Sequence, residues 1–140
     1  MSRMKRRIYV TVNRVTNAVV ARLGLRRFRG ADLLMLTTTG RTTGEPRTTP
    51  LIYHADGDRW IVVASNGGAD WEPGWWLNLR AGTAAEVTIG DEVTPVHGTE
   101  LTGTDREQMW ATLNDQVFDY QSYQDKVSRT IAVVALTPVG

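Results

Sequence analysis

The stretch LLMLTTTGRTTGEPRTTPLIYH, residues 33–54, places two runs of apolar and β-branched residues on either side of a segment rich in glycine and proline. Threonine and branched apolar residues favour strands, whereas glycine and proline favour reversals. The pattern therefore predicts a β-hairpin whose loop is GRTTGEP, residues 40–46. These propensities account for the threonines, glycines and prolines, but they give no reason for Arg41 and Arg47.

The segments outward from this hairpin continue as short strands with a few helices. A second hairpin is predicted through residues 55–58, because an Asp-Gly pair suits a tight reversal. Thr104 and Glu107 have the spacing of a capping box at the start of a helix. The predicted architecture is α+β, a small β-barrel of five or six antiparallel strands. Further strands are expected over 59–65, 84–90, 92–101 and 129–138, and helices over 73–80, 105–116 and 118–128.

The amino-terminal part of the chain differs sharply in charge from the rest. Residues 1–30 carry nine Arg or Lys and no acid, whereas the other 110 residues carry seven basic and fifteen acidic side chains. Ile8, Val12, Val15 and Val19 recur at helical spacing, so a basic amphipathic helix is predicted over 1–30, ahead of a barrel domain over 31–140. Three uses of this helix stay open: packing on the acidic barrel, peripheral attachment to anionic lipid, or a contribution to an anion site.

Composition excludes several classes of protein. A chain of 140 residues is the size of one domain, and the absence of cysteine removes disulfides and thiolate chemistry. Two histidines give little support to a metal site, and we predict none. No apolar run has the length of a membrane span, and no signal sequence is evident, so a cytoplasmic protein is expected. The acidic barrel argues against binding to nucleic acid. Nucleophile-elbow, Walker and dinucleotide-binding motifs are also absent.

The first candidate site lies in the hairpin loop. Arginine forks bind phosphate or carboxylate, and the backbone N–H groups of a glycine-containing turn bind the same oxygens. The alternative is an ordinary hairpin with surface arginines. The residues that would bind an anion here are Arg41, Thr42, Thr43, Gly44 and Arg47.

Three further groups of residues have the composition of a ligand site. SNGG, residues 65–68, follows a predicted strand, where glycine allows a ligand to approach the backbone. Trp71, Trp75 and Trp76 either bury their indoles in the core or flank a flat ring. Tyr120 and Tyr123 are three residues apart on a predicted helix, so their phenols share one face. The alternative for these tyrosines is plain surface exposure.

Three motifs in series, TTTGRTTGEPRTTPL, VVASNGGADWEPGWWLNL and YQDKVSRTIAVVALTP, resemble the deazaflavin-dependent nitroreductase family of oxidoreductases. They run in the family's order from Leu33 to Pro138. The resemblance implies a split β-barrel that binds the 8-hydroxy-5-deazaflavin coenzyme F420. It also implies hydride transfer from the reduced cofactor to quinones, activated enones or nitroaromatics.

The resemblance further implies roles for particular residues. The arginine loop matches the motif that holds the phosphate and oligoglutamate tail of F420, the SNGG turn matches the motif near the deazaflavin ring, and the tryptophan segment matches a helix along the cofactor. Tyr123, Ser65 and Tyr120, in that order, are the expected catalytic residues. The expected cofactor-binding residues are Arg41, Thr42, Thr43, Gly44, Arg47, Pro50, Ala64, Ser65, Asn66, Gly67, Gly68, Trp75 and Asn78.

Other interpretations remain beside this one. The enzymatic alternative is an FMN-dependent split-barrel oxidoreductase, and the non-enzymatic one is a cofactor-binding or membrane-surface module. A small-molecule hydride acceptor is the expected partner, with peripheral contact to the inner face of the membrane through residues 1–30 as a further expectation. A monomer is predicted. Thr42 stands where many family members have a basic residue, which predicts weaker binding of the anionic tail.

Overall fold

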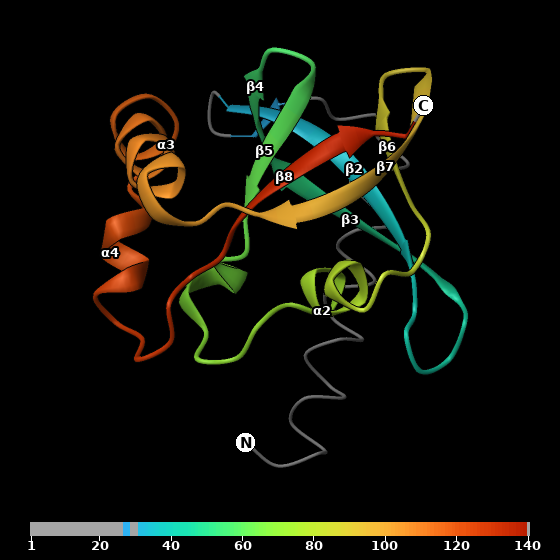
Figure 1. Ribbon diagram of the computed structural model, residues 1–140, viewed down its shortest axis with the longest axis horizontal. Coiled ribbons are helices and arrows are strands. Elements are labelled where there is room, and N and C mark those ends of the chain that lie inside the picture. The colour runs from blue at the N-terminus through green and yellow to red at the C-terminus, as the bar shows by residue number, and fades with distance from the viewer. Residues whose placement is uncertain (1–26, 29–30, 140) are drawn as a thin grey trace.

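The computed structural model describes residues 27–28 and 31–139 (Figure 1). The predicted amphipathic helix therefore lies outside the described residues. Within them, the strands are β1 (Arg27–Phe28), β2 (Ala31–Thr39), β3 (Pro46–Ile52), β4 (His54–Asp56), β5 (Arg59–Val63), β6 (Ala85–Ile89), β7 (Glu92–Glu100) and β8 (Val133–Pro138). A short 3-10 helix, η1 (Asn66–Gly68), follows β5, and the α-helices are α2 (Gly74–Arg80), α3 (Gly103–Gln116) and α4 (Tyr120–Gln124).

All the strands join one curled antiparallel sheet. Its order is β1-β2-β6-β7-β8-β5-β4, and β3 also pairs with β2, from Leu33 opposite Ile52 to Thr39 opposite Pro46. Both hairpins expected near the start of the barrel form: Thr39 pairs with Pro46 around the arginine loop, and Asp56 pairs with Arg59 around Gly57. The prediction of an antiparallel α+β architecture is confirmed.

Alternation along β5 and β8 gives these central strands two apolar faces, because successive side chains of a strand point to opposite sides. One face packs on α2 and the other on α3 and α4, which lie together on one side of the sheet in Figure 1. The α2 face contains Val62, Val134, Leu136, Trp75, Trp76 and Leu79, and the other contains Ile61, Val133, Ala135, Met109, Leu113 and Tyr120. Helix α2 is thus fixed beside the β2–β3 loop, where the candidate site lies.

Three local predictions differ from the structure. The described residues contain eight strands rather than five or six, because the short strands β1 and β4 add to the sheet. Helix α3 is preceded by Thr102, not Thr104, and Thr102 makes no side-chain capping hydrogen bond. Helix α4 covers only Tyr120–Gln124, with Asp119 at its start accepting a hydrogen bond from the Ser122 backbone.

Two residues of the predicted amino-terminal segment take part in the sheet. Arg27 and Phe28 of β1 pair with Asp32 and Ala31 of β2. The proposed boundary at residue 30 therefore falls inside this pairing. As for membrane insertion, none of the helices among the described residues has the length and apolar character needed to cross a bilayer.

Candidate active site

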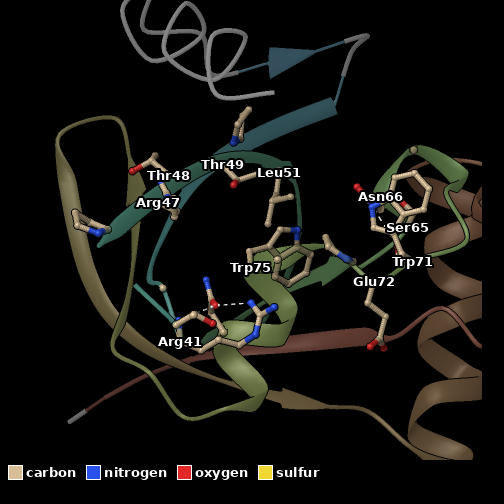
Figure 2. A pocket seen from close by; sticks show the side chains of 18 of the residues that line it. Arg41, Arg47, Thr48, Thr49, Leu51, Ser65, Asn66, Trp71, Glu72 and Trp75 are labelled. Atoms are coloured by element: carbon tan, nitrogen blue, oxygen red, sulfur yellow. Dashed lines mark hydrogen bonds between the residues drawn. The ribbon is translucent and has the colours of Figure 1, made fainter. Parts of the chain in front are cut away.

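A cavity of about 500 Å³ lies between the β2–β3 loop, the turn after β5 and the start of α2 (Figure 2). Concave sites of this size are typical of small-molecule and cofactor binding. Two stretches of the sequence, 40–51 and 63–78, meet here. The lining residues are Gly40, Arg41, Thr42, Thr43, Pro46, Arg47, Thr48, Thr49, Pro50, Leu51, Val63, Ser65, Asn66, Gly67, Trp71, Glu72, Pro73, Gly74, Trp75 and Asn78.

Most of the predicted cofactor-binding residues line this cavity, but three do not. Gly44 lies in the loop with a positive φ of 72°, and its N–H donates to the Gly40 carbonyl over 2.9 Å. Glycine adopts this backbone conformation without a steric penalty. Ala64 is fully buried, and Gly68 packs against Tyr123. Ala64 and Gly68 therefore adjoin the cavity lining without forming part of it, and Gly44 shapes the loop that carries Arg41 and Arg47.

Asn78 anchors the arginine loop to helix α2. Its side-chain Oδ1 accepts hydrogen bonds from the Arg41 backbone N–H over 3.1 Å and from Arg41 Nη1 over 2.9 Å. Its Nδ2 donates to Thr38 Oγ1 over 3.0 Å, and both Asn78 and Thr38 are buried. Because buried amides need partners for both their donor and acceptor groups, this asparagine fixes α2, β2 and the loop in one arrangement.

Arg47 has a buried donor group that no described residue satisfies. Its Nη1 lacks a hydrogen-bond partner among residues 27–28 and 31–139, and its Nη2 lies 3.8 Å from the Glu45 carboxylate. A buried, unsatisfied donor is unfavourable, and a charged one more so. A phosphate or carboxylate in the cavity would satisfy it, so the donor set on this wall fits an anionic ligand.

The turn after β5 has an unusual backbone. Asn66, Gly67 and Gly68 all have positive φ, at 50°, 62° and 84°. Glycine tolerates this region and asparagine does so better than most residues. The Gly68 and Ala69 N–H groups donate to the Ser65 and Asn66 carbonyls. Within this turn, Ser65, Asn66 and Gly67 line the cavity, and Asn66 Nδ2 donates to the Trp71 carbonyl over 3.0 Å.

The remaining wall is largely apolar, with one carboxylate. Leu51, Val63 and Trp75 lie on it, and Trp75 is nine-tenths buried. Glu72 also lines the cavity, but its carboxylate forms a bidentate pair with Arg80 over 3.2 and 2.9 Å. The two arginines of the loop, Arg41 and Arg47, beside this apolar wall suit a ligand with a flat ring and an anionic tail.

Neither predicted catalytic tyrosine lines the cavity. Tyr120 is buried against Phe118 and Trp110. Burial, with a smaller contribution from Tyr123, raises the pKa of Tyr120 to about 12. The ring of Tyr123 lies behind the 65–67 turn, so close to Gly68 that an added Cβ there would approach it to 3.0 Å. Of the three expected catalytic residues, only Ser65 lines the cavity, and the catalytic roles stay predictions.

Arg129 is the main residue of this region to which sequence analysis gave no role. Its guanidinium donates to the Ala64, Ser65 and Ala69 carbonyls over 3.1 to 3.2 Å, which cross-links the turn to the segment before β8. Burial lowers the pKa of Arg129, whereas the nearby carboxylates of Glu72 and Asp70 act in the opposite direction. A lone arginine between a short helix and a strand carries no sequence signal for such a contact.

Comparison with known proteins now adds to this geometry. The sequence profile of the F420H(2)-dependent quinone reductase family matches residues 5–138. The chain belongs to this family. F420 is accordingly its cofactor, and the unsatisfied Arg47 donor beside Arg41 fits the anionic tail of that group. The family is one of oxidoreductases, as the motifs implied.

Curated relatives and solved structures agree with this assignment. The F420H(2)-dependent quinone reductase Rv1261c of Mycobacterium tuberculosis is 37% identical over 134 residues, which cover 94% of this chain and 88% of the relative. A structure described as an F420-H2 dependent reductase (FDR-A) has a TM-score of 0.66 at 33% identity and covers 74% of this chain and 92% of its own. Another, described as a domain-swapped dimer, has a TM-score of 0.67 at 30% identity and covers 87% of this chain and 96% of its own. The predicted split β-barrel fold is confirmed.

Proposed function

We propose that this chain reduces quinones with F420H2, and that activated enones and nitroaromatics are further acceptors of the same kind. The observation that carries the proposal is the meeting of two arginines, a backbone turn and an apolar wall around one cavity. Family membership supports the cofactor, and the names of the relatives support a quinone as acceptor. Each part of the cavity then has a distinct role.

Arg41 and Arg47 hold the anionic tail of the cofactor, while Asn66, Gly67 and Trp75 hold its ring. When bound, reduced F420 supplies a hydride from a ring carbon, as nicotinamide cofactors do. Reduction of a quinone to a quinol needs one proton besides the hydride. Ser65 lines the cavity, and its hydroxyl would donate a hydrogen bond to the acceptor oxygen as charge develops there, with the proton then taken up from solvent.

The direct test is anaerobic turnover. Mixing the protein with F420H2 and menadione should restore the absorbance of oxidised F420 at a rate proportional to protein concentration. A protein without added F420 is the control, because a copurified FMN would show its own visible spectrum and support the FMN-dependent alternative. Failure to turn over any quinone, enone or nitroarene would contradict the proposal and favour a binding module.

We also propose that the chain is cytoplasmic and that residues 1–30 bring it to anionic lipid at the inner face of the membrane. Support comes from nine basic residues without an acid in that segment, since each contributes about 1 kcal/mol near an anionic surface. Removing residues 1–26, which leaves β1 intact, should abolish cosedimentation with phosphatidylserine vesicles at low salt. Unchanged cosedimentation would contradict the lipid role.

A monomer is the proposed oligomeric state. The described residues close into one sheet whose core is built from α2, α3 and α4 of the same chain. A structural relative at 30% identity is described as a domain-swapped dimer, which is the alternative to this proposal.

A further inference from the structure

Arg129 is joined to the 65–67 turn by a set of contacts that the proposed function does not use. Four hydrogen bonds run from its guanidinium to the carbonyls of Ala64, Ser65 and Ala69, two of them to Ala69. These partners are separated from Arg129 by 60 to 65 positions in the sequence. One side chain therefore connects both ends of the turn to the segment that precedes β8.

The Arg129 backbone is itself held by helix α4. Gln124 Nε2 donates to the Arg129 carbonyl over 2.7 Å, and Gln124 Oε1 accepts from the Ile131 N–H over 2.9 Å. The preceding residue of the helix, Tyr123, packs its ring on Gly68. The turn is thus supported from behind by α4 and Arg129, while Ser65 and its two successors face the cavity.

Such support matters because of the backbone of the turn. Three successive residues have positive φ, and one of them, Asn66, is not a glycine; the Gly68 and Ala69 N–H groups donate within the turn, and Asn66 Nδ2 donates to the Trp71 carbonyl over 3.0 Å. Residues in this region persist when their surroundings impose the conformation. A planar guanidinium with five donors in a fixed fork makes four hydrogen bonds to these three carbonyls, whereas an ammonium group has only three donors and no fixed fork.

We infer that Arg129 is a positioning residue, which holds the 65–67 turn in the shape required by the cofactor and its acceptor, and that Gln124 keeps Arg129 in place. The inference rests on the proposed function for the identity of the ligand. The effect of Arg129 on the shape of the turn does not depend on that function. Arg129 itself does not line the cavity, so it acts through Ser65, Asn66 and Gly67.

The experiment compares Arg129→Ala with Arg106→Ala as a matched control. Arg106 also donates to a carbonyl of the same segment, that of Ile131 over 2.8 Å, and it stacks on Trp110, away from the cavity.

Hydrogen exchange of the cofactor-free proteins reports on the turn, and fluorescence titration with F420 reports on binding. Arg129→Ala should speed exchange of the Gly68 and Ala69 amides by about tenfold, since these bonds open locally. It should also weaken F420 affinity by about fivefold. This is less than the loss expected for a residue that contacts the ligand, because Arg129 acts indirectly. Arg106→Ala should change neither value.

The outcomes separate the two proposals. If Arg129→Ala leaves exchange of the turn unchanged, or if Arg106→Ala alters exchange and affinity equally, the inference is wrong. If the wild-type protein binds no F420, the proposed function fails, while the exchange comparison still decides the role of Arg129 in the turn. Arg129→Lys should restore part of the affinity. Should Arg129→Ala fail to fold, Gln124→Ala takes its place. It must then show faster exchange of the turn amides and weaker F420 affinity, both to a smaller degree, and unchanged values would overturn the inference.

Discussion

Replacing Arg47 by alanine should weaken F420 binding by about 10- to 100-fold with little loss of fold stability. A charge-assisted hydrogen bond contributes about 1.5–3 kcal/mol, and tenfold in affinity corresponds to about 1.4 kcal/mol. Arg47 lines the cavity, its Nη1 is buried without a described partner, and its ion pair with Glu45 is 3.8 Å long and exposed on the Glu45 side. Its removal therefore takes away a ligand contact and very little that stabilises the fold. Fluorescence titration with F420 and urea unfolding measure the two effects.

Arg59→Ala is the matched control for this prediction. The Arg59 side chain is 27% exposed, close to the 31% of Arg47, and it also pairs with carboxylates, those of Asp56 and Asp105. It does not line the cavity. Equal affinities of Arg47→Ala and wild-type protein would contradict the assignment, and an equal loss in Arg59→Ala would show that net charge, rather than the position of Arg47, governs binding.

The strands were predictable because their signal is local. In RWIVV, residues 59–63, the alternation that places Ile61 and Val62 on opposite faces is a property of any extended chain. The hairpin turns follow from Asp-Gly and glycine-proline chemistry in the same way. The start of α3 was misplaced because Thr102 and Thr104 are equally suitable caps by residue type, and the choice between them depends on how the chain leaves β7.

The candidate site was only partly predictable for a physical reason. The arginine loop and the SNGG turn carry their own signal, since glycine and arginine are needed there for backbone shape and charge. Arg129 and Glu72 gain their positions from long-range contacts that no short motif encodes. Tyr123 was expected to face the ligand, yet whether a helical side chain faces a cavity or the back of a turn is decided by how the helix packs.

Asn78→Leu should have the second large effect, on both stability and binding. The leucine is similar in size, but it leaves Arg41 without two hydrogen bonds and Thr38 without one. Loss of a buried polar network of this kind costs about 2–4 kcal/mol in the free energy of unfolding. Since the same bonds hold Arg41 at the cavity, F420 affinity should fall by about tenfold or more. Asn114→Leu is the matched control, because Asn114 donates to the Trp110 carbonyl within α3, accepts from the Gln121 N–H of α4, and lies outside the cavity lining.

Asn78→Asp separates anchoring from charge. The carboxylate can still accept from the Arg41 backbone and guanidinium, and the Thr38 hydroxyl can rotate to donate to it, so the loop should keep its place. The new negative charge would neutralise Arg41 and repel an anionic tail. Its stability should therefore stay closer to wild type than that of Asn78→Leu, while its F420 affinity falls. Wild-type affinity in Asn78→Asp would mean that Arg41 contributes no charge to binding and that Asn78 serves the fold alone.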